Sequence, residues 1–143
     1  MPNLTVTEQQ LHLIQEALDF YSRVGIGQFD VIKDHPTFYN VLHKSFTSKE
    51  GKMDYERYHA IRNNVDMMMV SPRNALLNHL DLPRNASWGI YNPEVDESCR
   101  VAYDLVQVIR HEFWKANPNR SEHVVSSSKH LSTKDSDKIK VEL

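Results

Sequence analysis

The chain has 143 residues, and its 17 lysines and arginines against 19 aspartates and glutamates give a formal net charge of -2. Such a balance does not draw a protein to nucleic acid or to anionic lipid, so a nucleic-acid partner is not expected. One cysteine excludes an intrachain disulfide framework and fits a reducing compartment. The sequence also lacks an apolar run of the ~20 residues that a membrane span needs, and it lacks the N-terminal pattern of a secretory signal. We therefore expect a cytoplasmic protein with no membrane partner.

The low glycine content predicts an all-α fold. Only four glycines occur, and strand-like alternation is scarce. We expect a compact multi-helix domain over residues 1–116, followed by an extended or flexible tail over residues 117–143. Ile139, Val141 and Leu143 alternate as in a short strand, so this tail is expected to extend away or to dock on a neighbouring subunit.

The first helix is expected to begin at a threonine cap and to end at glycine. Thr5 and Thr7 are each followed three residues later by Glu or Gln, which is the capping-box pattern. Gly25 and Gly27 are suited to the left-handed backbone that often ends a helix. Two apolar rows along this helix predict that it packs against more than one neighbour.

Shorter elements are expected in the middle of the chain. Residues 28–33 read as a helical turn, and a helix capped by Asp34 is expected to run to about Phe46. After a polar loop over residues 47–52, Asp54 is expected to open another helix. We expect Ser71-Pro72 to break that helix, and a short apolar turn or helix to follow over residues 75–80.

The longest helical pattern covers residues 95–114, with Asp96 as its N-cap. Its core face is predicted to comprise Val95, Cys99, Ala102, Val106, Ile109 and Phe113. Its solvent face is predicted to carry Glu97, Arg100, Asp104 and His111. Between the two faces lies a stripe of polar-tipped and aromatic side chains, which the irregular segment of residues 84–94 leads into.

This stripe and segment provide a candidate ligand site. Recognition of a nucleotide needs an aromatic plane for stacking, an arginine for phosphate and amides for the base edges. The candidate ligand-binding residues are Trp88, Tyr91, Asn92, Tyr103, Gln107 and Arg110. Aromatic and arginine side chains also line the rims of helix and subunit interfaces, so an interface remains the alternative.

No catalytic residue, metal site or cofactor is predicted. The eight histidines lack a second ligand at metal-binding spacing, and Cys99 falls on the core face. The acidic pairs Glu16/Asp19 and Asp96/Glu97 are few for a magnesium site. A small nucleotide-processing enzyme that uses Asp, Glu and His at a cleft remains an alternative to a binding protein.

Excess apolar surface predicts a homo-oligomer. The first helix and the helix of residues 95–114 both carry apolar residues beyond one core face. On the latter these are Val101, Leu105 and Val108. In a chain this short, such an excess is most simply buried between subunits.

Several segments resemble those of small uncharacterised proteins encoded by tailed bacteriophages. These segments are EALDFYSRVG followed by GQFD, then SWGIYNPEV, then AYDLVQVIRHEFW, and the resemblance extends over residues 11–114. It implies a phage accessory protein, acting in the host cytoplasm, that binds and neutralises a host component. The target would be a host protein or a nucleotide signal of bacterial immunity. Neutralising such a target would be an anti-defence role. The resemblance carries over no catalytic residue.

Overall fold

The computed structural model describes residues 4–119, and in this range it is all-α, as predicted. The elements are α1 (Glu8–Gly25), the 3-10 helix η1 (Phe29–Asp34), α2 (Pro36–Phe46), α3 (Tyr55–Leu76) and α4 (Glu97–Ala116). None of these helices combines the length and the apolar character that crossing a membrane requires. The predicted strand at Ile139, Val141 and Leu143 lies outside the described residues.

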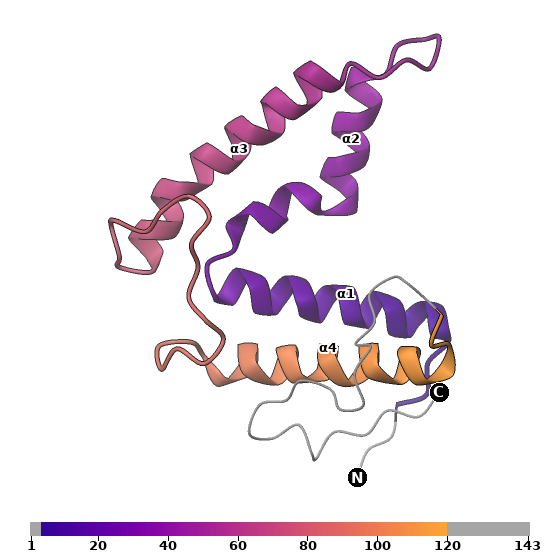
Figure 1. Cartoon of the computed structure of the whole chain (residues 1–143), viewed down its shortest axis with the longest axis vertical. Coiled ribbons are helices and arrows are strands. Elements are labelled where there is room, and N and C mark those ends of the chain that lie inside the picture. The colour runs from indigo at the N-terminus through magenta and orange to yellow at the C-terminus, as the bar shows by residue number, and fades with distance from the viewer. Residues whose placement is uncertain (1–3, 120–143) are drawn as a thin grey trace. The chain divides into compact units, whose positions relative to one another are not determined.

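The chain divides into two compact units (Figure 1). One contains α1 and α4, which come from the two ends of the described chain. The other, Gly27–Trp88, contains η1, α2 and α3. We call them the α1/α4 unit and the α2/α3 unit.

Local capping signals set the starts of α1 and α4, as predicted. The Thr7 hydroxyl accepts from the Gln10 backbone N–H at 3.2 Å, and the Gln10 side chain accepts from the Thr7 N–H at 2.8 Å. At α4, the Asp96 carboxylate accepts from the Ser98 N–H at 2.9 Å. The two helices lie antiparallel, side by side (Figure 1). The predicted core face of α4 is buried in full.

Gly25 lets α1 approach α4 closely. A Cβ added at this residue would lie 2.1 Å from the Cys99 Sγ, which is far inside van der Waals contact. As predicted, α1 ends at Gly25, and the left-handed residue after the C-cap Ile26 (φ -96) is Gly27, with φ 84. Along the pair, the Tyr21 hydroxyl also shares a 2.7 Å hydrogen bond with Ser98.

The predicted solvent face of α4 is wrong at two residues. Asp104 and His111 are buried, although Glu97 is exposed and Arg100 is partly exposed. The His111 ring stacks on Trp114 with centroids 5.5 Å apart, so an aromatic neighbour one turn away covers it. The spacing of three residues places these two rings together, but it does not show that His111 is buried.

In the α2/α3 unit, α2 and α3 are joined by a tight loop that is closed by an isolated bridge between Thr47 and Met53. Asp54 caps α3 by accepting from the Arg57 N–H at 3.1 Å, as predicted. The predicted cap of α2 at Asp34 is wrong. His35 takes that position, and its Nδ1 accepts from the Thr37 N–H at 3.3 Å. Asp34 is instead paired with Arg62 of α3.

The predicted helix break at Ser71-Pro72 is also wrong, because α3 continues through Pro72 to Leu76. Proline removes the hydrogen bond to the carbonyl of Met68. Met68 is exposed, so water can solvate that carbonyl. The next two residues, Arg73 and Asn74, are tied to the following loop, and these tertiary contacts hold the last turn of α3 in place.

Candidate functional site

Arg110, the predicted phosphate ligand, forms an ion pair within the α1/α4 unit. Its Nη2 lies 3.3 Å from the Asp19 carboxylate of α1. The other oxygen of that carboxylate accepts from the Arg23 Nε at 2.8 Å. Two arginines therefore share one carboxylate, and the cluster of Asp19, Arg23 and Arg110 carries one net positive charge. A phosphate approaching Arg110 would have to compete with Asp19.

Tyr91 and Tyr103 lie close to this cluster. Burial raises the pKa of Tyr103, and the neighbouring charges of Tyr91, Asp104 and Asp19 raise it further, while the Arg110 guanidinium opposes them. Tyr91 is 65% exposed. The structure thus brings together Tyr91, Tyr103 and Arg110 from the candidate set.

The other candidates are placed differently. Gln107 is only 6% exposed, so its amide is not available to a ligand from solvent. The Asn92 side chain accepts from the Glu94 N–H at 2.9 Å, and its carbonyl accepts from Arg100 at 3.3 Å, so this residue shapes the turn before α4. Trp88 is half-buried and belongs to the α2/α3 unit.

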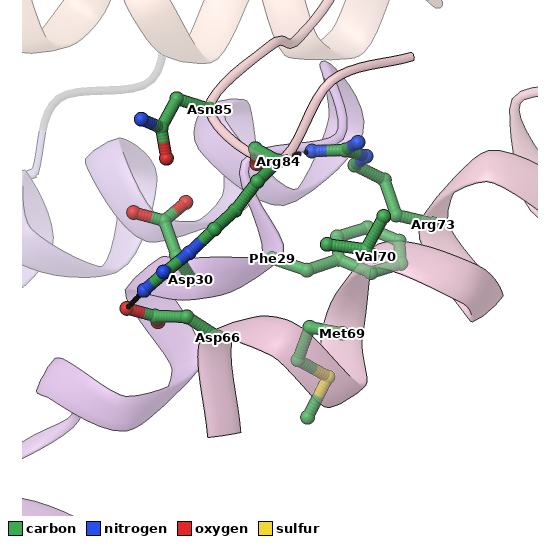
Figure 2. Close-up of a pocket in the computed structure, with 8 residues that line it drawn as sticks. All are labelled: Phe29, Asp30, Asp66, Met69, Val70, Arg73, Arg84 and Asn85. Atoms are coloured by element: carbon green, nitrogen blue, oxygen red, sulfur yellow. Dashed lines mark hydrogen bonds and ion pairs between the residues drawn. The ribbon is translucent and has the colours of Figure 1, made fainter. Parts of the chain in front are cut away.

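A small pocket lies within the α2/α3 unit (Figure 2). Its lining comprises Phe29, Asp30, Asp66, Met69, Val70, Arg73, Arg84 and Asn85. Figure 2 shows Arg84 extended toward Asp66, with its Nη2 3.1 Å from that carboxylate. Asp66 also forms an ion pair with Lys33 of η1. The two ion pairs of Asp66 therefore connect η1, α3 and the loop after α3.

Arg73, at one side of this pocket, is a structural residue. It is only 4% exposed, and its guanidinium donates to the carbonyls of Leu82, Pro83, Arg84 and Ala86 at 2.8 to 3.0 Å. It also donates from Nε and Nη2 to the Asn74 side chain at 2.9 and 2.7 Å. A guanidinium has five N–H groups, and all are used here. Arg73 therefore has no donor left for a ligand.

Exposed apolar side chains concentrate on the α2/α3 unit. It holds nine of the fourteen large hydrophobic residues that are exposed in the described part of the chain. They are Phe38, Tyr39, Val41, Tyr55, Ile61, Met67, Met68, Leu76 and Leu80. No residue of α2 is buried. Exposed apolar side chains become candidates for an interaction site where they form one patch.

Sequence reasoning did not find Arg73, Asp66 or this apolar surface. The partners of Arg73 are backbone carbonyls, which leave no signal in a sequence, and the 33 residues between Lys33 and Asp66 exceed any helical spacing. The exposed residues of α2 and α3 follow helical periodicity, which predicts a face but not what covers it. Among residues 4–119, no three His, Cys, Asp or Glu side chains lie close enough to hold a metal ion.

Comparison with protein-family models, with curated proteins and with solved structures finds no match to this chain. The residues described above are therefore the basis for the function proposed below.

Proposed function

We propose that the protein is a non-enzymatic binding protein whose target is another protein, and that α2 forms part of its binding surface. The observation that carries this proposal is that no residue of α2 is buried and that three of its large apolar side chains are exposed. Phe38, Tyr39 and Val41 of α2 are 51%, 43% and 59% exposed. Aromatic residues are enriched at protein interfaces, where they supply large contact areas at low entropic cost. An amphipathic helix of this kind can also occupy a groove on its partner.

The class of target that we propose follows from the phage setting that the sequence resemblance implies. We propose that the target is a component of the host cell and that binding neutralises it. We also propose that the protein is a homo-oligomer, which is supported by the large share of its apolar side chains that remain exposed.

The test uses a double variant on α2. Phe38→Ala combined with Val41→Ala removes apolar contact area, and Asn40→Ala is the matched control because Asn40 is exposed on another side of the same helix. Tagged full-length proteins would be incubated with host lysate, and each captured protein would then be purified and its dissociation constant measured. We expect a target that the wild type and Asn40→Ala bind equally, and that the double variant binds at least tenfold more weakly.

Equal affinity for all three proteins would refute the role of α2. Far-UV circular dichroism must show the same helix content in each variant, so that lost binding is not confused with unfolding.

A second candidate is sequestration of a small nucleotide in the α1/α4 unit. The proximity of Tyr91, Tyr103 and Arg110 supports it, since they provide two aromatic rings and a cation. Thermal melting against a panel of linear and cyclic nucleotides, with and without magnesium, tests this idea. A ligand at 100 times its dissociation constant adds about 2.7 kcal/mol to the unfolding free energy. Arg110→Ala should remove the shift without unfolding the protein.

No shift with any nucleotide would refute sequestration and leave the protein target. If a nucleotide does bind, its chemical state after incubation separates a binding protein from an enzyme. Recovery of unchanged nucleotide supports sequestration, and a modified nucleotide would support a nucleotide-processing enzyme.

A further inference from the structure

The helix α1 covers only one side of α4. The Cys99 side chain lies against α1 at one end of the helix pair, and the Phe113 ring stacks on His12 of α1 at the other, with ring centroids 4.1 Å apart. Val108 lies nine residues after Cys99, and Asp104 lies nine residues before Phe113. Nine residues make about two and a half turns of an α-helix, so the two members of each pair point in opposite directions. Val108 and Asp104 therefore lie on the side of α4 that faces away from α1.

This side of α4 is nevertheless buried in its middle. It is a stripe with steps of four, three, four, three and four, which consists of Glu97, Val101, Asp104, Val108, His111 and Lys115. Asp104, Val108 and His111 are 1%, 4% and 5% exposed, and we call these three residues the far face of α4. Val101 is 40% exposed, and the residues at both ends of the stripe are exposed as well. The far face is buried within a single chain, so its cover does not come from a second copy.

The described segments of the α1/α4 unit do not supply this cover. Residues 89–96 join α4 at its N-terminal end, where the stripe is exposed. Residues 117–119, which leave the C-terminal end of α4, are themselves exposed, and so is Leu4 ahead of α1. A compact unit makes most of its contacts internally, and the remaining long part of this unit is residues 120–143. The cover is therefore expected from those residues.

The sequence of residues 120–143 suits the far face. That face combines an aliphatic side chain with a carboxylate and an imidazole, so its cover must offer both apolar contact and hydrogen-bonding groups. Residues 120–143 contain six aliphatic residues, five lysines and arginines, and seven serines and threonines. A purely apolar partner would leave the polar groups of the far face without hydrogen bonds, whereas this segment provides both kinds of contact.

The segment also has the length to reach the far face. Val108 lies about 12 Å along the axis from the end of α4, at 1.5 Å per residue. The five residues from Asn119 to Val124 span up to about 17 Å when they are extended. Val124 and Val125 are therefore the first aliphatic residues after α4 that can contact Val108.

We propose that the chain after residue 119 turns back along α4 and covers its far face, with Val124 and Val125 against Val108. In this way Val108, which lies outside the core face that α1 covers, is buried without a second subunit. Gln107, next to the far face, is buried as well. The covering segment therefore also borders the candidate nucleotide site, and its release would expose the Gln107 amide.

The reactivity of an introduced thiol toward a small disulfide reagent tests this cover in the full chain. Val108→Cys should react slowly, because thiol reactivity depends on access. Adding Val124→Asp and Val125→Asp should raise the rate about tenfold or more, since two carboxylates do not stay against a buried side chain. Ser126→Asp with Ser127→Asp is the matched control. It adds the same charge beside the valines but keeps them, so the rate should stay low.

The native Cys99 reports on folding in every variant. It is buried against α1, so it should stay unreactive for as long as α1 and α4 remain paired. Mass spectrometry of the digested protein assigns each label to residue 99 or to residue 108.

A crosslink tests the same contact without adding charge. Val108→Cys with Val125→Cys should form a disulfide within one chain under mild oxidation, which requires Cα atoms within about 7 Å. Val101→Cys with Val125→Cys is the control and should crosslink far more slowly. Residue 101 lies on the same side of α4, but it is exposed and about 10 Å further along the axis.

Each other outcome counts against the proposal in a different way. Fast labelling of Val108→Cys in the otherwise native chain would refute the burial of the far face. Slow labelling in all three sequences would assign the cover to another part of the molecule, and labelling that slows as the protein concentration rises would assign it to a second copy. If the aspartate variant also exposes Cys99, the pair of α1 and α4 has opened and the crosslink decides. Equal crosslinking from residues 101 and 108 would refute the contact.

Discussion

The contact between Gly25 and Cys99 predicts that Gly25→Ala lowers the stability of the wild type but not that of a Cys99→Ala variant. Gly25→Ala alone introduces a methyl group whose carbon would lie 2.1 Å from the Cys99 Sγ. Carbon atoms in good contact are about 3.5 to 4.0 Å apart, so the two helices must separate or the thiol must leave its position. Forced overpacking of this kind costs about 1–3 kcal/mol. The helix gains up to about 1 kcal/mol from alanine in place of glycine. With the full gain subtracted, we therefore expect a net loss of up to about 2 kcal/mol.

In a Cys99→Ala background the same substitution should be harmless. The nearest remaining atom is then the β-carbon at residue 99, which is 3.2 Å away, so a shift of a few tenths of an ångström relieves the contact. Cys99→Ala alone should cost about 1 kcal/mol for the buried sulfur that it removes. Adding Gly25→Ala should leave the stability unchanged or raise it by up to about 1 kcal/mol. The coupling energy is then about 1–3 kcal/mol in favour of the double variant.

The assay is urea unfolding followed by far-UV circular dichroism for the wild type, the two single variants and the double variant. Gly89→Ala is the control in both backgrounds, because no atom lies within 4 Å of an added Cβ at that residue. If Gly25→Ala and Cys99→Ala add to within about 0.5 kcal/mol, the close approach of α1 and α4 at this point is wrong.

Three further predictions concern a buried guanidinium, a helix cap and a tyrosine. Arg73→Met should lower the free energy of unfolding by about 3 kcal/mol. The carbonyls that Arg73 binds lose a charged donor, and the loss is limited because these partly exposed oxygens can bind water instead. Arg73→Lys should lower the free energy of unfolding by less, because lysine keeps the charge. Urea unfolding of both variants measures this, and equal losses would contradict the role of the planar donor array. Hydrogen bonds from the Ser98 side chain and backbone lower the pKa of Asp96. Asp96→Ala should therefore lower the melting temperature above pH 3.8, and the difference should vanish as acid protonates Asp96. Burial raises the pKa of Tyr103, so stability should fall as the pH rises above about 10, and Tyr103→Phe should remove this component. An identical alkaline loss in both proteins would contradict it.

The features that were predicted correctly from the sequence are those set by neighbouring residues. The caps at Thr7, Asp54 and Asp96 are interactions over two or three residues, so a short window of sequence contains both partners. The core face of α4 follows from its period alone. The break expected at Pro72 failed because a local rule was overridden by contacts of Arg73 with a loop 9 to 13 residues later.

The positions of the candidate site residues could be predicted only in part, because they too depend on contacts between residues that are distant in the sequence. The order of Tyr103, Gln107 and Arg110 around α4 could be read from the sequence, but the exposure of each depends on what covers it. The partner of Arg110 is Asp19, which is 91 residues away in the sequence and on another helix. No spacing rule connects residues so distant, so the sequence does not distinguish a free arginine from a paired one.

The contacts of Arg73 have a consequence for how this protein tolerates sequence change. Arg73 and Asn74 hold the loop of residues 80–86 through its carbonyl oxygens, which every amino acid provides. Apart from Arg84, whose side chain pairs with Asp66, the loop can therefore keep its path through changes of its exposed side chains, provided that Arg73 and Asn74 stay. Mutational scanning should thus find two intolerant residues at the end of α3 beside a permissive loop, which gives this protein a segment that can diversify without loss of the fold.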